Sequence, residues 1–336
     1  MKGVEGKLNK PKVSILVPVY NSQKYLRECL DSVVNQTLKE IQIICIDDGS
    51  TDSSPDILAE YASKDDRIEI ITKENSGYGA SMNRGLDAAR GEYIGIVESD
   101  DFAEPDMFQK YYTIAARKRL DIVKSNYFEH SSGQGDNKIR EYGRRAMLWG
   151  TFDPSARPNV ILFNPLIWSA IYRRQMLEDS NIRFLETPGA SYQDSSFVHR
   201  CWFAADVVKF LPSAYLHYRV DNEASSVKSS AKVYAICDEY AESERFLTEH
   251  PDKWVVFAPY LEVSKYNTYR WNYNRIAACY REDFAKRWAQ DLSVGLQRGS
   301  IERKLFKKED WNQIQVIMKD PVKFAQDHID GNLPLY

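Results

Sequence analysis

The chain has 336 residues, of which 43% are hydrophobic and 28% are charged, and its 45 Lys and Arg nearly balance its 48 Asp and Glu. At about 100–200 residues per domain, this length predicts two domains or one large α/β domain with an appendage. The formal net charge of −3 excludes a nucleic-acid-binding protein that acts by neutralising phosphates, because no basic excess exists. With 7 Trp, 21 Tyr and 14 Phe, the chain has enough apolar surface for a core, which excludes disorder.

The cysteines and the apolar runs indicate a reduced, water-soluble protein. The five cysteines are widely spaced and include no C-x-x-C pair for zinc or redox chemistry. Residues 1–10 are polar and lack the apolar stretch of a signal peptide. The longest uncharged run, 158–172, is too short to span a bilayer. We therefore expect a cytoplasmic location.

Strand and helix patterns alternate over the first ~125 residues, which is typical of a parallel α/β sheet. Short apolar runs predict strands, and the segments between them have the spacing of amphipathic helices. The predicted strands are 13–19, 41–46, 68–71, 93–97 and one beginning at 120–123. Beyond residue 126 the alternation fades, and residues 131–137 are expected to form a turn or loose loop. From residue 231 onward, recurring aromatic residues predict packed helices.

Acidic loops follow two of the predicted strands. The second strand is followed by Asp47-Asp48-Gly49-Ser50 and the fourth by Glu98-Ser99-Asp100-Asp101. Because ligands of an open parallel sheet bind beyond the carboxyl ends of its strands, we expect these carboxylates around one crevice. Such a cluster is costly unless a cation neutralises it, and carboxylates without His or Cys favour Mg²⁺ or Mn²⁺ over zinc. Since these ions commonly bind diphosphates, the expected ligand is a nucleotide.

An ordinary turn is the alternative for either acidic loop taken alone, because Asp-Asp-Gly-Ser is a good turn sequence. Two such loops at equivalent strand ends favour a binding site. The loop at 75–79 is not G-x-G-x-x-G, and the Walker pattern is missing. A dinucleotide-binding fold and a P-loop NTPase are therefore excluded.

Residues 11–101 resemble the nucleotide-binding half of a family 2 glycosyltransferase with the GT-A fold. Four motifs carry the resemblance through their order and spacing: VSILVPVYN at 13–21, IDDGSTD at 46–52, Asn83 with Gly85 before Gly91-Glu92-Tyr93, and ESDD at 98–101. The resemblance implies an α/β fold in which helices flank a mostly parallel sheet, followed here by a mainly α-helical C-terminal region.

The resemblance also implies which residues bind a uridine diphosphate (UDP) sugar donor. Pro18 and Tyr20 would line the base pocket, and Asp48 would read the uracil edge. Asn83 matches a further position of the nucleotide-sugar-binding set.

A metal ion, Mn²⁺ or Mg²⁺, is implied at the ESDD motif. We expect Asp101 on the metal and Asp100 near the ribose. Because the motif begins with Glu98 in this chain, Glu98 and Asp101 are both candidates for the principal ligand.

A carboxylate base must take the proton of the attacking acceptor hydroxyl. Family members that invert the anomeric carbon place it in an acidic motif at the start of a helix, and the matching place here is Gln193-Asp194. We expect Asp194 to be that base; the alternative is that it only caps the helix.

Further candidates lie around these motifs. Arg219 is expected to pair with the diphosphate, and His217 to be another metal ligand, with a surface arginine and a core histidine as the alternatives. Trp168 and Tyr192 are expected on the acceptor side, because aromatic faces suit sugar rings, although both are equally typical of a core.

The expected organisation is a GT-A catalytic domain at 1–228 and a helical region at 229–336. Within the catalytic domain, residues 11–125 form the nucleotide-sugar-binding half and 126–228 the acceptor-side half. The helical region has balanced charge and no assignable motif; packing, a homodimer interface or docking of a lipid-linked acceptor are its candidate roles. Its basic stretch 298–308 is a candidate for peripheral membrane contact.

The resemblance implies an inverting, metal-dependent transfer of a single hexose or N-acetylhexosamine to a growing surface glycan, of the lipopolysaccharide or capsule type. Transfer of one sugar is favoured because no Gln-x-x-Arg-Trp motif of the processive synthases and no membrane helix is present. The alternatives are a sugar nucleotidyltransferase, which usually has a glycine-rich basic loop after its first strand, and a non-catalytic nucleotide-binding scaffold.

Overall fold

A computed structural model describes residues 10–139, 150–190, 192–222 and 232–329. The chain divides into two compact units that interleave in the sequence. The sheet unit comprises Met1–Asp153, Leu166–Ala190 and Ala204–Glu223, and the helical unit comprises Pro154–Pro165, Ser191–Phe203 and Ala224–Tyr336. The domain boundary expected at residues 228 and 229 lies outside the described residues.

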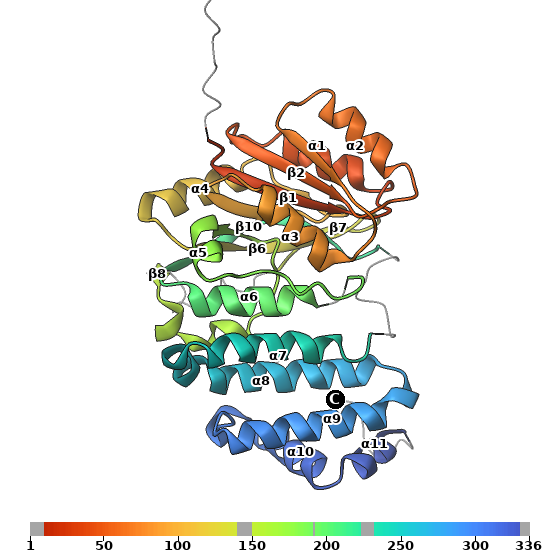
Figure 1. Ribbon diagram of the computed structural model, residues 1–336, viewed down its shortest axis with the longest axis vertical. Helices are drawn as coiled ribbons and strands as arrows, with labels where there is room; N and C mark the ends of the chain where they lie inside the picture. Colours follow the sequence, from red (N-terminus) through yellow and green to blue (C-terminus); the bar gives the residue numbers. More distant parts are fainter. Residues whose placement is uncertain (1–9, 140–149, 191, 223–231, 330–336) are drawn as a thin grey trace, which may run out of the picture. The chain divides into compact units, whose positions relative to one another are not determined.

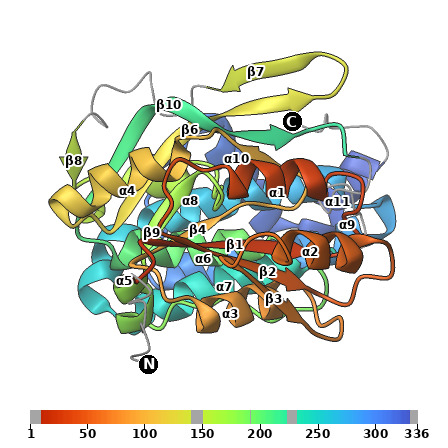
Figure 2. The same ribbon diagram turned by 90° about the horizontal axis from the view of Figure 1, so that it is seen from above.

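One mixed sheet forms the centre of the sheet unit (Figures 1 and 2). Its strand order is β3-β2-β1-β4-β9-β6-β10-β5, with β7 paired to β6 and β8 to β10. The strands are β1 (Val13–Val19), β2 (Ile41–Asp47), β3 (Ile68–Thr72), β4 (Tyr93–Ile96), β5 (Phe102–Ala103), β6 (Ile122–Ser131), β7 (Gly135–Ile139), β8 (Thr151–Phe152), β9 (Ala170–Arg173) and β10 (Val208–Arg219).

The predicted parallel α/β half is confirmed. Strand β1 pairs in parallel with β2 and β4, and β2 pairs in parallel with β3. The helices of this unit are α1 (Leu26–Val34), α2 (Ser54–Ala62), α3 (Tyr78–Ala88), α4 (Met107–Lys118) and α5 (Arg174–Asp179). Helix α3 packs closely on β1 and β2 because Gly85 faces them: a Cβ there would lie 3.0 Å from Ile46 Cδ1 and 3.2 Å from Leu16 Cδ1. The carboxyl ends of β1, β2 and β4 therefore meet at one edge.

The turn or loose loop expected at residues 131–137 is a shorter turn, residues 132–134, within a β-hairpin. Strand β6 continues to Ser131, and β7 begins at Gly135 and pairs antiparallel with it, from Tyr127 opposite Ile139 to Ser131 opposite Gly135. The side chains of β7 are mostly exposed, so this strand lacks the apolar alternation that predicts a strand from sequence. The hairpin brings His130 directly opposite Asp136.

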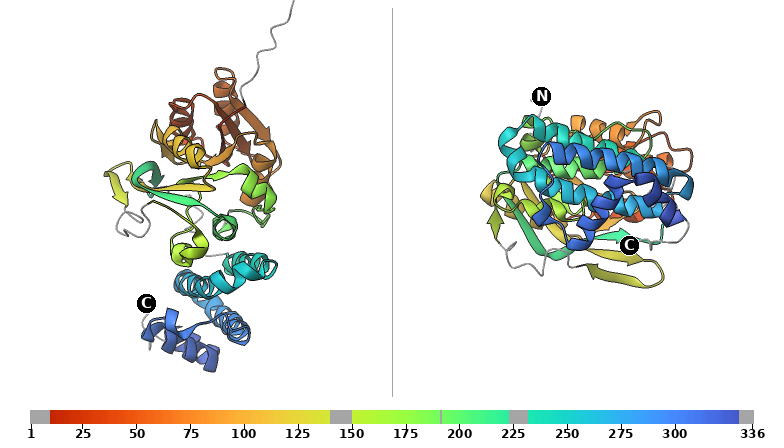
Figure 3. Two further views of the ribbon diagram at one scale, coloured as in Figure 1. Left: turned by 90° about the vertical axis from the view of Figure 1, so that its left-hand side faces the viewer. Right: turned by 90° about the horizontal axis from the view of Figure 1, so that it is seen from below.

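Helices make up most of the helical unit, as the aromatic pattern predicted (Figure 3). Helix α7 packs on α8, α8 on α9, and α9 on α10 and α11. Tyr266, Tyr269, Tyr273 and Trp288 are buried among these helices. The helices are α6 (Gln193–Ala204), α7 (Ala235–Thr248), α8 (Pro251–Arg275), α9 (Ala278–Gln297), α10 (Lys308–Lys319) and α11 (Pro321–Ile329), with the 3₁₀ turns η2 (Pro154–Ala156), η3 (Pro158–Leu162) and η5 (Arg303–Leu305). Within the described ranges, no helix combines the length and apolar character needed to cross a membrane.

Candidate functional site

Asp48, just beyond the end of β2, organises the loop that leads into α3. Its carboxylate accepts hydrogen bonds from the amides of Ser76 and Gly77, each at 3.0 Å, and forms an ion pair with Lys73. Gly77 has a φ of +94°, a left-handed conformation in which a side chain would be strained. Asp48 thus shapes the edge of the sheet, and protein donors surround the oxygens expected to read uracil.

Lys73 is a site residue that the sequence analysis missed. Besides pairing with Asp48, it lines a polar cavity of about 280 Å³ that is also lined by Asn83, Arg84 and Arg183. A lysine after a predicted strand has no motif to distinguish it from a surface lysine. Only the fold shows that Lys73 meets Asp48 of the IDDGSTD motif, which follows the neighbouring strand.

The acidic turn, residues Glu98–Asp101, follows β4 at the same sheet edge. Asp101 is only 1% exposed, and its Oδ1 accepts a hydrogen bond from the Arg219 amide at 2.8 Å. Its Oδ2 is buried and has no hydrogen-bond partner in the part of the chain that the structure describes. Burial raises the pKa of Asp101 well above its ordinary value, and the nearby carboxylates of Asp100 and Glu98 add to the rise. A buried carboxylate oxygen without a hydrogen-bond partner, close to other carboxylates, fits a divalent cation. The cation would bind the oxygen and reduce the repulsion between the carboxylates.

Side-chain contacts join the acidic turn to the loops after β1 and β3. Ser22, beyond β1, shares a hydrogen bond of 2.7 Å with Ser99. Tyr78, at the start of α3, donates from its hydroxyl to Glu98 Oε1 at 2.7 Å. Asp100 Oδ2 accepts a hydrogen bond of 2.7 Å from the Asn222 amide. The structure therefore brings the expected motifs together at one edge of the sheet.

Arg219 is placed beside the acidic turn, but its donors are engaged by the protein. Its guanidinium donates to the Asp100 carbonyl at 2.9 Å and to Ser132 Oγ at 3.0 Å, and it pairs with Glu28. The guanidinium also lies 4.4 Å above the ring of Tyr25. The side chain expected to bind diphosphate thus holds the backbone of the acidic turn in place.

We expect Arg219→Gln to destabilise the chain, because four partners lose a buried cation. The free energy of unfolding should fall by about 3 kcal/mol. Urea unfolding measures this loss, with Arg27→Gln as the matched control. Arg27 pairs with Glu60 at the surface, with 53% of its side chain exposed, so its loss should cost about 0.5 kcal/mol or less. Equal small losses in both variants would contradict the positioning role of Arg219.

The remaining expected residues of the sheet unit have different environments. Pro18 is buried in β1, whereas Tyr20 beyond it is 53% exposed. Asn83 is buried, and its amide exchanges hydrogen bonds with the backbone of Phe184, at 2.9 and 3.0 Å. Trp168 is buried and stacks on Tyr218 with ring centroids 5.2 Å apart. Trp168 thus has the core environment that the sequence allowed as an alternative, whereas the contact of Asn83 with Phe184 was not evident from its motif.

His217 was expected to be a further metal ligand. Its ring nitrogens lie 3.1 Å from Glu104 Oε1 and 3.1 Å from Asp136 Oδ1. Phe102 and Phe128 stack on the two sides of the ring, with centroids 4.3 and 4.6 Å away. These contacts fix the orientation of His217.

Asp194 and Tyr192 belong to the helical unit. Asp194 lies in the first turn of α6, where a carboxylate is favoured by the helix dipole. Tyr192 precedes the helix with a φ of +62°, and its hydroxyl donates to Asn272 Oδ1 at 3.2 Å. The guanidinium of Arg275 lies 5.2 Å from the Tyr192 ring. The turn that presents Asp194 is therefore anchored on α8.

Glu239 on α7 is a buried carboxylate near Asp194 that the sequence analysis did not single out. Its Oε2 accepts a hydrogen bond from the Ser196 amide at 3.2 Å, and its Oε1 has no hydrogen-bond partner among the described residues. Burial raises the pKa of Glu239 to about 8, and the charge of Asp194 adds to the rise. No motif marks Glu239, because it lies 45 residues from Asp194 along the chain.

The carboxyl group of Glu239 makes the free energy of unfolding depend on pH, with stability falling as the pH rises. The pKa of Glu239 rises from an ordinary 4.5 to about 8, so the folded chain holds the proton more tightly than the unfolded chain. The contribution of Glu239 protonation to the free energy of unfolding is complete below pH 4.5 and is lost as the pH rises towards 8. We expect Glu239→Gln to remove a slope of at most about 1.4 kcal/mol per pH unit. Urea unfolding at several pH values between 4.5 and 8 measures this slope. The control is Asp238→Asn, which changes an exposed carboxylate. If the free energy of unfolding of wild type and of Glu239→Gln depended on pH in the same way, the prediction would be contradicted.

Comparisons with known proteins agree on the family. The Glycosyl transferase family 2 model matches residues 14–180. The chain is 37% identical to EpsH of Bacillus subtilis (strain 168), which carries a glycosyltransferase name, over 220 residues, 62% of this chain and 61% of EpsH. It is 30% identical to the cholesterol galactosyltransferase of Borreliella burgdorferi over 241 residues, 68% of this chain and 65% of that protein. The chain thus spans less than two thirds of the length of either relative.

Solved structures share the fold at low sequence identity. The crystal structure of S. aureus TarS residues 1–349 has a TM-score of 0.66 and 19% identity, covering 95% of this chain and 92% of that one. A mannosyltransferase of Pyrobaculum calidifontis, solved with GDP-Man and Mn²⁺, has a TM-score of 0.54 and 15% identity, covering 94% and 87%. The mixed sheet with its flanking helices is therefore a GT-A fold. Residues 14–180 therefore form a glycosyltransferase family 2 domain.

Proposed function

We propose that the chain is an inverting glycosyltransferase that takes a sugar from a UDP-sugar, with a divalent cation, and adds a single hexose or N-acetylhexosamine to a growing surface glycan. The observation that carries this proposal is the acidic turn, where buried Asp101 keeps an unpartnered oxygen at the sheet edge reached by the loops after β1 and β3. Structural neighbours solved with UDP and with UDP-GlcNAc support the choice of donor.

The acidic turn would hold the cation, with Asp101 and Asp100 as ligands. Asp101 contributes its unpartnered Oδ2, while Asp100 is the less buried of the two carboxylates. When bound, Mg²⁺ or Mn²⁺ supplies charge stabilisation for the leaving diphosphate. Arg219 holds both ligands, through the Asp100 carbonyl and through its own amide on Asp101.

The nucleoside would bind beside β1 and β2. Tyr20 offers an exposed aromatic face that suits a base, and Pro18 supplies the buried end of β1 beneath it. Asp48 and Lys73 offer an acceptor and a donor at the neighbouring strand end. Together they match the polar edge of a uracil ring, which presents both an N–H and carbonyl oxygens.

Asp194 would act as the general base. Its carboxylate takes the proton of the acceptor hydroxyl as the hydroxyl oxygen attacks the anomeric carbon and the bond to the diphosphate breaks. Glu239, whose raised pKa keeps its carboxyl protonated at neutral pH, would add no second negative charge near Asp194. A relative named as a poly(ribitol-phosphate) beta-glucosyltransferase, 44% identical over 116 residues, supports a surface-glycan acceptor.

Release of UDP from a panel of UDP-sugars, with Mn²⁺ and again with a chelator, tests this function. Slow hydrolysis of one donor that stops on chelation is the expected result. Failure to release UDP from any donor, with or without a glycan acceptor, would contradict it. Pyrophosphate release from UTP and a sugar phosphate would indicate a nucleotidyltransferase instead.

A further inference from the structure

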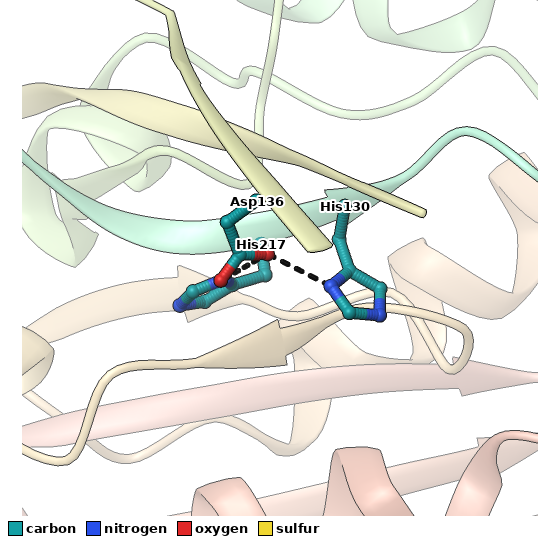
Figure 4. Close-up of side chains that lie close together, drawn as sticks. All are labelled: His130, Asp136 and His217. Atoms are coloured by element: carbon teal, nitrogen blue, oxygen red, sulfur yellow. Dashed lines mark hydrogen bonds and ion pairs between the residues drawn. The ribbon is translucent and has the colours of Figure 1, made fainter. Parts of the chain in front are cut away.

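Three side chains from three neighbouring strands converge on one point of the sheet unit. Asp136 Oδ1 on β7 lies 2.8 Å from His130 Nδ1 on β6 and 3.1 Å from His217 Nδ1 on β10. Figure 4 shows the carboxylate of Asp136 meeting both rings. One ligand atom from each residue lies within 4.8 Å of the others. Two imidazoles and one carboxylate at this spacing form a donor set that suits a transition-metal ion.

His217 is prepared to act as a metal ligand. Its Nε2 lies 3.1 Å from Glu104 Oε1, and a hydrogen bond to that carboxylate places the proton of the neutral ring on Nε2. The lone pair then resides on Nδ1, which points to the cluster. A metal-binding histidine commonly has its second nitrogen bonded to a carboxylate in this way.

Within the described part of the chain, Nδ1 of His217 has an ion-pair contact with Asp136 at 3.1 Å but no partner of hydrogen-bond geometry. The His217 side chain is buried, with only 6% exposed. Phe102 and Phe128 stack on both faces of the ring, so Nδ1 has no freedom to turn towards solvent. A metal ion between Nδ1 and the Asp136 carboxylate would satisfy this buried nitrogen.

We propose that His130, Asp136 and His217 bind Zn²⁺, at a site separate from the cation site of the acidic turn. Imidazole nitrogens favour Zn²⁺, whereas the carboxylates of the acidic turn favour Mg²⁺ or Mn²⁺. Asp136 is exposed, so a water molecule can complete a tetrahedral site. The ion would tie β7 to β10 beside Ser132, whose hydroxyl accepts from Arg219. It would thereby stabilise the hairpin that supports the acidic turn.

Metal titration of the full chain without a histidine tag tests the site. After chelator treatment, Zn²⁺ is titrated against a chromophoric chelator, and Co²⁺ is followed by its visible absorption. We expect one equivalent of metal, at least tenfold weaker binding in His130→Asn and Asp136→Asn, and about 10–100-fold weaker binding in Glu104→Gln. Both ligand variants change residues that are not fully buried, so they should fold. His250→Gln, which changes a histidine of the helical unit, should bind as wild type.

Two further measurements test the Zn²⁺ site independently of the titration: the thermal unfolding midpoint, and the effect of UDP on Zn²⁺ binding. Zn²⁺ should raise the midpoint of wild type and of Asp101→Asn, but not of His130→Asn, with or without UDP. Three results would overturn the proposal: no stoichiometric binding, binding unaffected by His130→Asn, or binding that needs UDP and disappears in Asp101→Asn. The last would place His217 at the donor cation.

Discussion

Replacing Asp194 by Asn should lower the rate of sugar transfer about 10³-fold, because an amide cannot take a proton from the acceptor hydroxyl. Asparagine has the size of aspartate and keeps one side-chain oxygen that can accept hydrogen bonds, so the first turn of α6 should stay intact. The substitution therefore separates the two roles that the sequence allows for this residue. The measurement is kcat for transfer, with UDP affinity measured alongside; the affinity should change less than twofold.

The control for Asp194 is Asp206→Asn, which removes an exposed carboxylate shortly after α6. Its transfer rate should equal that of wild type. If Asp194→Asn keeps its rate within fivefold of wild type while the control is unchanged, Asp194 is a helix cap and not the base.

Replacing Asp101 by Asn should lower kcat/KM for the donor about 10²-fold or more and remove its dependence on Mn²⁺. The amide oxygen of Asn can still accept the hydrogen bond of the Arg219 amide, so the turn keeps its geometry. What disappears is the negative charge at the buried, unpartnered oxygen. Donor kinetics over a range of Mn²⁺ concentrations measure the effect.

Two further variants define the ligand assignment at the acidic turn. Asp100→Asn should show a similar loss, because both carboxylates are proposed as ligands. Asp106→Asn, a carboxylate shortly beyond the turn that lies 3.9 Å from Lys110, should behave as wild type. Full Mn²⁺ dependence in Asp101→Asn, with its loss in Asp100→Asn, would show that Asp100 alone holds the cation.

The part of the fold that the sequence predicts best is the part with the strongest local signals. Strands β1, β2 and β4 are continuously buried and mostly apolar, and each ends near a turn sequence. Their parallel order places the acidic loops at one edge, which follows from the general rule for ligands of such sheets. The motifs, the sheet edge at which they meet and the family resemblance can therefore be inferred from the sequence alone.

Contacts between segments far apart in the sequence could not be predicted. The bond from the Arg219 amide to Asp101 joins residues 118 positions apart, and it depends on β5 pairing with β10. Asn83 looks like a ligand-binding residue in its motif, yet its amide is used by the backbone of Phe184. Hairpin β6–β7 is polar on its outer strand, so its pattern resembles a loop. In each case the decisive partner lies in another element.

Calorimetric titration of UDP into the full chain tests the central claim most directly, namely that the acidic sheet edge binds a uridine diphosphate through a divalent cation. With Mn²⁺ present, we expect one UDP to bind per chain, at least tenfold more tightly than ADP or CDP. A chelator, or the change Asp101→Asn, should each weaken the binding at least tenfold. Equal affinity for UDP with Mn²⁺ and with the chelator, or no preference for UDP over ADP and CDP, would contradict the account.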